Sequence, residues 1–231
     1  LASPLEAEPD SLGEPDDWQA EWKWDGIRAQ LIRRGGQTWI WSRGEERMDG
    51  RFPELEAAAE ALPDGTVLDG EIMAWRDGCP LPFSLLQTRI GRKKPGKVTL
   101  DKAPVALLAY DCLEFEGRDL RQQPLHGRLE AMTRALAEAD KPIERSPRIE
   151  FKDWSALPEQ RDRSRELRVE GLMLKRLSSP YRVGRKRGDW WKWKVEPYTF
   201  DGVLLYAQPG HGRRSNLFTD YTFAVHHDGD L

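Results

Sequence analysis

Residues 21–28, Glu-Trp-Lys-Trp-Asp-Gly-Ile-Arg, form the segment whose side chains have the clearest capacity for chemistry. Side chains alternate between the two faces of a β-strand, so Glu21, Lys23 and Asp25 would share one face and the two tryptophans the other. The tryptophans would anchor the strand in the core. A lysine attacks phosphorus only as the neutral amine, a form that burial and nearby cations favour. The segment therefore predicts a nucleophilic lysine, although an exposed lysine in a hairpin would give the same short pattern.

A second alternating segment, Trp-Trp-Lys-Trp-Lys at residues 190–194, places Lys192 and Lys194 on one strand face. Two lysines on one face repel each other unless an anion lies between them, and a triphosphate is the natural candidate. An exposed basic edge strand is the alternative. The tryptophans indicate that the opposite face is buried, so we expect the lysines to line a cleft.

Three acidic segments complete this set of residues. Leu-Asp-Gly-Glu-Ile at 68–72 places Asp69 and Glu71 on one strand face, and Ala-Tyr-Asp at 109–111 ends an apolar run. Glu-Gly-Leu-Met-Leu-Lys at 170–175 places an acid before a strand and a lysine near its end. Carboxylates that converge on a nucleotide hold hydrated Mg²⁺ or bond the ribose hydroxyls. Any one of these acids could be a solvated loop residue, whereas the three segments together indicate a nucleotide site.

Short strands dominate the chain that must position these residues. We expect strands at residues 18–24, 28–33, 38–41, 66–75, 104–112, 172–176 and 190–195. We expect helices at residues 52–62, 83–90, 125–139 and 154–167. Gly35 and Gly36 predict a hairpin turn between the second and third strands. The elements predict an α+β fold in which antiparallel sheets flanked by helices form a nucleotide cleft.

Composition divides the chain into three parts. Residues 1–16 are rich in Pro, Gly and acids and predict a linker or an arm on the surface. Residues 17–196 hold all the motifs described above and form the main domain. Residues 197–231 are too few to build a core alone, which predicts the opening part of a truncated small β domain. Two strands are expected in it, at residues 200–208 and 222–226.

The charge is unevenly distributed along the sequence. The net charge is −3, but residues 1–20 hold six acids and no Lys or Arg, so the remainder carries +3. Basic clusters occur at residues 89–97 and 182–187, which permits a face that meets phosphates. Solvated surface charge is the simpler interpretation of these clusters on their own.

The remaining features exclude several classes of protein. No apolar run approaches the ~20 residues that span a bilayer. Cys79 and Cys112 lack metal-ligand spacing, and so few thiols indicate a reducing cytosol. The four histidines form no zinc-like or triad-like spacing. The chain starts without Met and stops directly after a strand-like run, so we expect a fragment of a longer protein.

Taken in order, these segments resemble the nucleotidyltransferase superfamily of DNA ligases, RNA ligases and mRNA-capping enzymes. The Glu-Gly-Leu-Met-Leu-Lys segment and Arg43 within Ser-Arg-Gly look most like ATP-dependent DNA ligases, and the first and last motifs look bacterial. The resemblance covers most of the chain. Its six motifs occupy residues 23–28, 42–44, 69–71, 109–111, 170–175 and 191–194.

The resemblance implies a role for each site residue. Lys23 would form the lysyl–AMP phosphoramidate, Glu21 would meet the exocyclic amine of adenine, and Tyr110 would stack on the base. Arg28 and Arg43 would contact ribose and phosphates, including the 5′-phosphate of a nick. The other residues would bind metal or phosphate: Glu71 the ribose or a metal-bound water, Glu170 the metal, and Lys175, Lys192 and Lys194 the phosphates.

The resemblance also implies a fold and partners. The main domain would be an antiparallel-sheet nucleotidyltransferase domain, ATP-grasp-like, followed by a truncated OB-fold barrel. The protein would use ATP, with AMP as covalent intermediate, and Mg²⁺. Its substrate would be nicked double-stranded DNA, with no membrane partner, and it would be a cytoplasmic monomer.

Two points depart from the family pattern. The family carries a final motif near the end of its small β domain, and larger members add an N-terminal DNA-binding domain; this chain shows neither. We therefore expect it to hold AMP or ATP and to seal nicks poorly. Glu170 and Lys175 are also an odd number of residues apart, so they would face opposite sides of a flat strand unless Gly171 kinks the chain.

Two other functions remain open at this point. RNA ligation or guanylyl transfer would use the same lysine chemistry and differ in nucleotide or strand preference. A non-catalytic nucleic-acid-binding module would keep the fold, but a degenerate site should have lost some of its lysines and acids.

Overall fold

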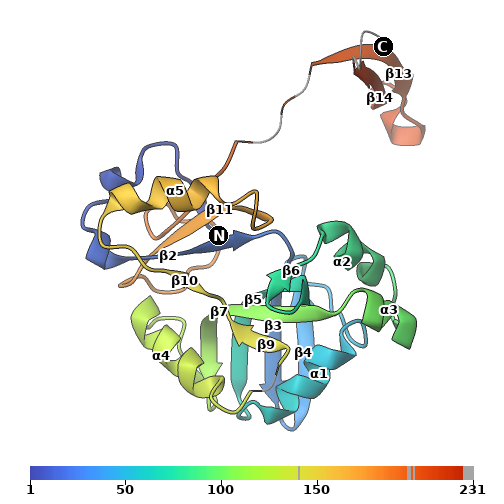
Figure 1. The fold of residues 1–231 in the computed structure, drawn as a ribbon. Helices are drawn as coiled ribbons and strands as arrows, with labels where there is room; N and C mark the ends of the chain where they lie inside the picture. The colour runs from blue at the N-terminus through green and yellow to red at the C-terminus, as the bar shows by residue number, and fades with distance from the viewer. Residues whose placement is uncertain (140, 197–198, 200, 226–231) are drawn as a thin grey trace. The chain divides into compact units, whose positions relative to one another are not determined.

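The computed structural model describes every residue except 140, 197–198, 200 and 226–231. The chain divides into two compact units, Leu1–Val195 and Glu196–Leu231. The first unit combines helices with two largely antiparallel sheets, the mixed architecture that the sequence predicts (Figure 1).

One sheet of the first unit has five strands in the order β1-β12-β11-β2-β10. Its strands β11 and β2 pair antiparallel, as do β11 and β12, whereas β1 joins β12 in parallel. Alternate apolar side chains, including Trp18, Leu172 and Trp193, form a core on one face, to which Leu157 of helix α5 (Leu157–Asp162) contributes. The strands are β1 (Ser3–Pro4), β2 (Trp18–Trp24), β10 (Arg148–Ile149), β11 (Val169–Arg176) and β12 (Trp190–Lys194).

The second sheet has seven strands, in the order β4-β3-β5-β7-β8 with β6 beside β5 and β9 beside β7. Strands β5 and β7 are buried on both faces along most of their length. Gly35 and Gly36, at φ 58° and 71°, form the predicted turn between β3 and β4. The strands are β3 (Ile27–Arg34), β4 (Gln37–Ser42), β5 (Thr66–Arg76), β6 (Cys79–Pro80), β7 (Val105–Phe115), β8 (Arg118–Asp119) and β9 (Ile143–Arg145).

Helices pack against this second sheet and form the larger core with it. Leu55, Leu86 and Leu129, one from each of α1, α2 and α4, are buried against strand residues such as Leu68 and Leu107. A smaller cluster, formed by Trp24, Met73, Leu108 and Val169, joins the two sheets. The helices are α1 (Pro53–Ala58), α2 (Phe83–Ile90), α3 (Lys97–Lys102) and α4 (Leu125–Ala135).

Three helices are shorter than the periodicity predicts. The helix expected at 52–62 is α1 followed by a 3₁₀ turn at Ala59–Ala61, and the one expected at 125–139 ends at Ala135. The prediction of a long helix at 154–167 is wrong: a 3₁₀ turn at Trp154–Ala156 leads into the short α5. Within α5 only Leu157 is buried, so no apolar stripe exists to stabilise further turns.

The first sixteen residues belong to the first unit as an arm. Ser3 and Pro4 pair with Trp191 and Lys192, and Leu5 and Leu12 pack against the core of the five-stranded sheet. Two 3₁₀ turns, Pro9–Leu12 and Pro15–Asp17, carry the arm toward β2. The segment therefore covers an edge of the five-stranded sheet, as an arm on the surface would.

The second unit is described as one antiparallel hairpin. Strands β13 (Gly202–Pro209) and β14 (Phe218–Val225) pair with each other, with a 3₁₀ turn at Gly212–Arg214 between them. The strand ends predicted at residues 200 and 226 lie outside the described residues. Apolar side chains such as Leu204 and Phe223 are about half exposed, because two strands alone cannot bury them.

Two further features concern the environment of the chain. Among the described residues, no helix has both the length and the apolar character needed to cross a bilayer. Cys79 is exposed and Cys112 is buried, and both are free thiols.

Candidate active site

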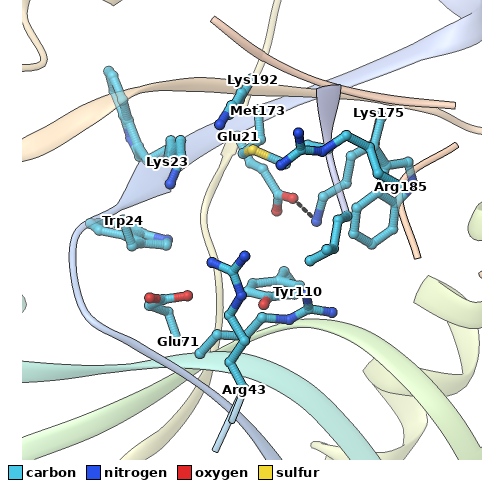
Figure 2. A pocket seen from close by; sticks show the side chains of 15 residues that line it. Glu21, Lys23, Trp24, Arg43, Glu71, Tyr110, Met173, Lys175, Arg185 and Lys192 are labelled. Atoms are coloured by element: carbon cyan, nitrogen blue, oxygen red, sulfur yellow. Dashed lines mark ion pairs between the residues drawn. The ribbon is translucent and has the colours of Figure 1, made fainter. Parts of the chain in front are cut away.

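A pocket of about 180 Å³ is lined by residues from both sheets of the first unit (Figure 2). Strands β2, β11 and β12 supply one wall, and β3, β5, β7 and the end of β4 supply the other. Of the ten site residues expected from the sequence, Glu170 and Lys194 do not line the pocket but form ion pairs next to Lys23. The eight that line it are Glu21, Lys23, Arg28, Arg43, Glu71, Tyr110, Lys175 and Lys192.

Lys23 lies in a cluster of three charges. Its Nζ is 2.6 Å from Oε2 of Glu170, and Lys194 Nζ donates to Oε1 of the same carboxylate at 2.9 Å. Burial acts to raise the pKa of Glu170, but hydrogen bonds from both lysines outweigh it and hold that pKa below its usual value. Glu170 therefore stays ionised. It forms ion pairs both with Lys23 in the segment at residues 23–28 and with Lys194 in the segment at residues 191–194.

A bulge in β11 brings Glu170 into this cluster. The register between β11 and β2 shifts between Val169 and Leu172, and Gly171 has φ 135°, a conformation that other residues rarely adopt. A Cβ at Gly171 would lie 2.3 Å from the carbonyl oxygen of Trp193. The kink that the sequence requires at Gly171 is therefore present, and it lets Glu170 and Lys175 serve the same site.

Arg28 is fixed by a buried carboxylate on the neighbouring strand. Its Nε and Nη2 donate to Oδ1 and Oδ2 of Asp69 at 3.1 and 2.7 Å. The hydroxyl of Tyr181 donates to Asp69 Oδ2 at 2.6 Å and accepts from Arg28 Nη2 at 2.7 Å. Charge-assisted bidentate pairs of this kind fix the guanidinium geometrically, so Arg28 is oriented at the pocket wall before any ligand binds.

Glu21 and Lys175 face each other across β2 and β11 as a buried ion pair, marked by the dashed line in Figure 2. Lys175 Nζ also lies over the rings of Tyr110 and Trp190, 4.2 and 4.4 Å from their centroids. The charge of Lys175 is thus matched by a carboxylate and two ring faces, and its expected role in neutralising phosphates stays a prediction.

Glu71 is a carboxylate of the pocket wall whose pKa is raised. Burial raises its pKa to about 7, while the positive charge of Lys23 opposes the shift. Gly26 permits the close approach of the β2–β3 turn, since a Cβ there would lie 2.4 Å from the Ile72 carbonyl oxygen. Among the described residues no three His, Cys, Asp or Glu side chains gather as a metal-binding group.

The expected alternation holds along β12 but not for the two tryptophans of β2. Trp191 and Trp193 are buried on the far side of β12, while Lys192 lines the pocket. Burial lowers the pKa of Lys192, with Lys194 as a further cause. Trp22 and Trp24, expected on the face opposite Lys23, both line the pocket, next to the place where the register of β2 with β11 shifts.

Several pocket residues were not expected from the sequence. Trp190 and Met173 line the pocket on the strands that carry the lysines, and Arg185 lies in the basic cluster noted only for its charge. Alternation along β11 could have identified Met173, which is two residues from Lys175. Tyr181, the partner of Asp69, follows a proline in a loop, and no sequence pattern points to it.

Comparison with known proteins gives the class of this fold and site. A family model described as the ATP dependent DNA ligase domain matches residues 1–194. This chain therefore belongs to the ATP-dependent DNA ligase domain family. The matching family is that of the DNA ligases rather than of RNA ligases or capping enzymes.

Individual relatives agree with that family. A probable DNA ligase of Opitutus terrae is 35% identical over 246 residues, which cover 93% of this chain and 24% of the relative. A probable DNA ligase of Koribacter versatilis is 33% identical over 251 residues, covering 97% of this chain and 43% of the relative. The chain thus spans less than half the length of these relatives.

Solved structures of ATP-dependent DNA ligases resemble this chain as well. Mycobacterial DNA ligase D complexed with ATP and MES superposes with a TM-score of 0.65 and 26% identity, covering 90% of this chain and 64% of that one. The ATP-dependent DNA ligase from bacteriophage T7 in complex with ATP shares the fold, with a TM-score of 0.55 and 18% identity. The match covers 97% of this chain and 79% of that one.

Proposed function

We propose that this chain is the adenylyl-transferring core of a DNA ligase that seals nicks in double-stranded DNA. One observation carries the proposal: Lys23 projects from a wall of a pocket whose rim is rich in cations, within ion-pair distance of Glu170. Such a set of lysines and arginines suits a nucleoside triphosphate as its ligand.

The first step would join AMP to Lys23. The neutral amine attacks the α-phosphorus of ATP, the N–P bond forms, and the bond from that phosphorus to pyrophosphate breaks. Because Lys23 is ion-paired, its ammonium group must first lose a proton, and Glu170 Oε2 at 2.6 Å is the nearest acceptor. Lys192 and Lys194 would stabilise the charge that develops on the leaving pyrophosphate.

The later steps would act on the nick. The 5′-phosphate attacks the lysyl–AMP and takes the AMP group, which frees Lys23. The 3′-hydroxyl then attacks the adenylated end, forming the phosphodiester bond and releasing AMP. Arg28, already oriented by Asp69, and Arg43 are the candidates for holding the ribose and the 5′-phosphate.

Mg²⁺ suits one acid that lines the pocket and one that lies beside it. This ion is usually held by one or two protein carboxylates together with substrate phosphates, so a group of three ligands is not required. The candidates are Glu71, whose raised pKa a cation would reverse, and Glu170. When bound, the ion would offset negative charge on the triphosphate.

We also propose a fold family for each of the two units. The hairpin of β13 and β14, with its exposed apolar side chains, suits the opening strands of an OB-type barrel. The main domain, which we place at residues 17–196, would be ATP-grasp-like. We further propose a monomer that works in the cytoplasm.

Intact mass after incubation with ATP and Mg²⁺ tests the chemistry. The chain should gain the mass of one AMP, Lys23→Ala should lose that gain, and Lys152→Ala, at an exposed position, should keep it. A gain that persists in Lys23→Ala would assign the nucleophile elsewhere. Transfer of the label to nicked DNA, but not to nicked RNA, should follow; the reverse preference would contradict DNA ligation.

A further inference from the structure

Tyr181 lies in the segment that joins β11 to β12, and it is not one of the residues that line the pocket. Its ring packs edge-on against Trp190, with centroids 5.9 Å apart, and the guanidinium of Arg128 lies over it. The backbone is held as well. Arg128 Nη1 donates to the carbonyl of Ser179 at 2.9 Å, and the amide of Tyr181 donates to the carbonyl of Arg121 at 2.8 Å. The segment therefore fixes the position of the Tyr181 hydroxyl.

This hydroxyl completes the set of partners around the guanidinium of Arg28. Nη2 of Arg28 has two hydrogens, and its two acceptors are Asp69 Oδ2 and the Tyr181 hydroxyl, each at 2.7 Å. Nε donates to Asp69 Oδ1 at 3.1 Å. Nη1 is the nitrogen of this guanidinium for which the described residues supply no acceptor. Because Arg28 lines the pocket, Nη1 is the nitrogen that it can offer to a ligand.

The Tyr181 hydroxyl stays protonated in these surroundings. Burial raises its pKa and the negative charge of Asp69 raises it further, while the charge of Arg28 opposes the shift. The hydroxyl therefore donates its proton to Asp69 Oδ2 at 2.6 Å and keeps its lone pairs to accept from Arg28. Asp69 is fully buried, so this donor also helps to satisfy a carboxylate shielded from water. Phenylalanine at residue 181 would keep the ring and remove both bonds.

We propose that Tyr181 is a positioning residue that holds Nη1 of Arg28 ready for an oxygen atom of the bound nucleotide. This inference rests on the proposed binding of ATP in the pocket. Nη1 has two N–H donors, which suit a ribose hydroxyl or a phosphate oxygen. A guanidinium held by fewer bonds would have to be ordered each time the nucleotide binds, at a cost in affinity. Tyr181 acts through Arg28 and need not touch the ligand.

Titration calorimetry with ATP and Mg²⁺ measures this effect in chains that carry Lys23→Ala and therefore cannot form the covalent bond. Tyr181→Phe should weaken ATP binding about 3- to 10-fold, the usual effect of one hydrogen bond. Tyr206→Phe, at an exposed position, is the matched control and should leave the affinity unchanged. Arg28→Lys keeps a positive charge beside Asp69 but has no Nη1, so it should weaken ATP binding at least about 10-fold.

A double-mutant cycle separates positioning from a purely structural role. In chains that carry Arg28→Lys, adding Tyr181→Phe should change the ATP affinity by less than about 2-fold, because the nitrogen that the hydroxyl orients is already gone. Tryptophan fluorescence in the absence of urea checks that each chain is folded. A hydroxyl that served only the fold would leave the ATP affinity of the folded protein unchanged.

Three outcomes would overturn the inference and leave the proposed function standing. They are an unchanged ATP affinity in folded Tyr181→Phe, an unchanged affinity in Arg28→Lys, and an equal loss from Tyr181→Phe with and without Arg28→Lys. The last would mean that Tyr181 does not act through Arg28. If no chain binds ATP, the proposed function fails and this inference fails with it. If ATP binds with the expected affinities but Lys23 gains no AMP, the adenylyl transfer is contradicted and the positioning of Arg28 stands.

Discussion

Replacing Glu71 by glutamine should stabilise the protein at alkaline pH while impairing nucleotide chemistry. The folded-state pKa of Glu71 is about 7, against an ordinary value of 4.5. The folded protein therefore holds a proton that the unfolded chain has already released between those values, so stability falls as pH rises through this window. Full stability from this group is present below pH 4.5 and is lost above about pH 7.

The magnitude follows from the size of the shift. A change from 4.5 to about 7 corresponds to about 3 kcal/mol. Because the side chain keeps some solvent exposure, screening reduces the expected gain to about 2 kcal/mol. Glutamine does not titrate, so the advantage of Glu71→Gln should grow from near zero at pH 4.5 to its full value at pH 8.

Urea unfolding followed by tryptophan fluorescence measures the difference at each pH. All ten tryptophans lie within the first unit, so the signal reports that unit. Glu60→Gln, at an exposed position, is the matched control and should change stability by less than about 0.5 kcal/mol at every pH. The reasoning is refuted if Glu71→Gln is no more stable than the parent chain at pH 8, or if its advantage does not vary with pH.

Two further substitutions test how the site is supported. Arg128→Met should lower the free energy of unfolding, measured in urea, by about 3–5 kcal/mol. The reason is that the buried Asp111 carboxylate, 2.7 Å from Arg128 Nε, would lose its counter-charge. A loss below about 1 kcal/mol would contradict this. Gly171→Ala should lower the rate of AMP attachment at least about tenfold, since its Cβ would meet the Trp193 carbonyl at 2.3 Å and flatten the bulge. Gly36→Ala, at φ 71° with open space around it, should cost about 1 kcal/mol and leave AMP attachment unchanged.

Local chemistry and alternation predicted much of this protein. The strand at Trp18–Trp24 and the helix at Phe83–Ile90 match the expected elements, because each has a period that only one secondary structure can satisfy. The hairpin at Gly35 and Gly36 follows from turn chemistry in the same way. The extent of the helix after Trp154 could not be predicted, because its length depends on which residues find a core to pack against.

At the site, too, the sequence predicted some features and the tertiary structure decided others. Residue types and spacing predicted a lysine nucleophile with cations and acids around it, because phosphoryl chemistry requires these groups, and the structure brings those side chains together. The nucleophilic role of Lys23 itself stays a prediction. Which of these side chains form ion pairs with one another, however, is decided by the pairing of strands that lie far apart in the sequence. The bulge at Gly171 brings Glu170 to Lys23, and the register of β2 with β11 buries Lys175 against Glu21. The sequence by itself determined which charges the site contains, and only the tertiary structure decided which of them neutralise one another, because ion pairing depends on distance and burial rather than on residue type.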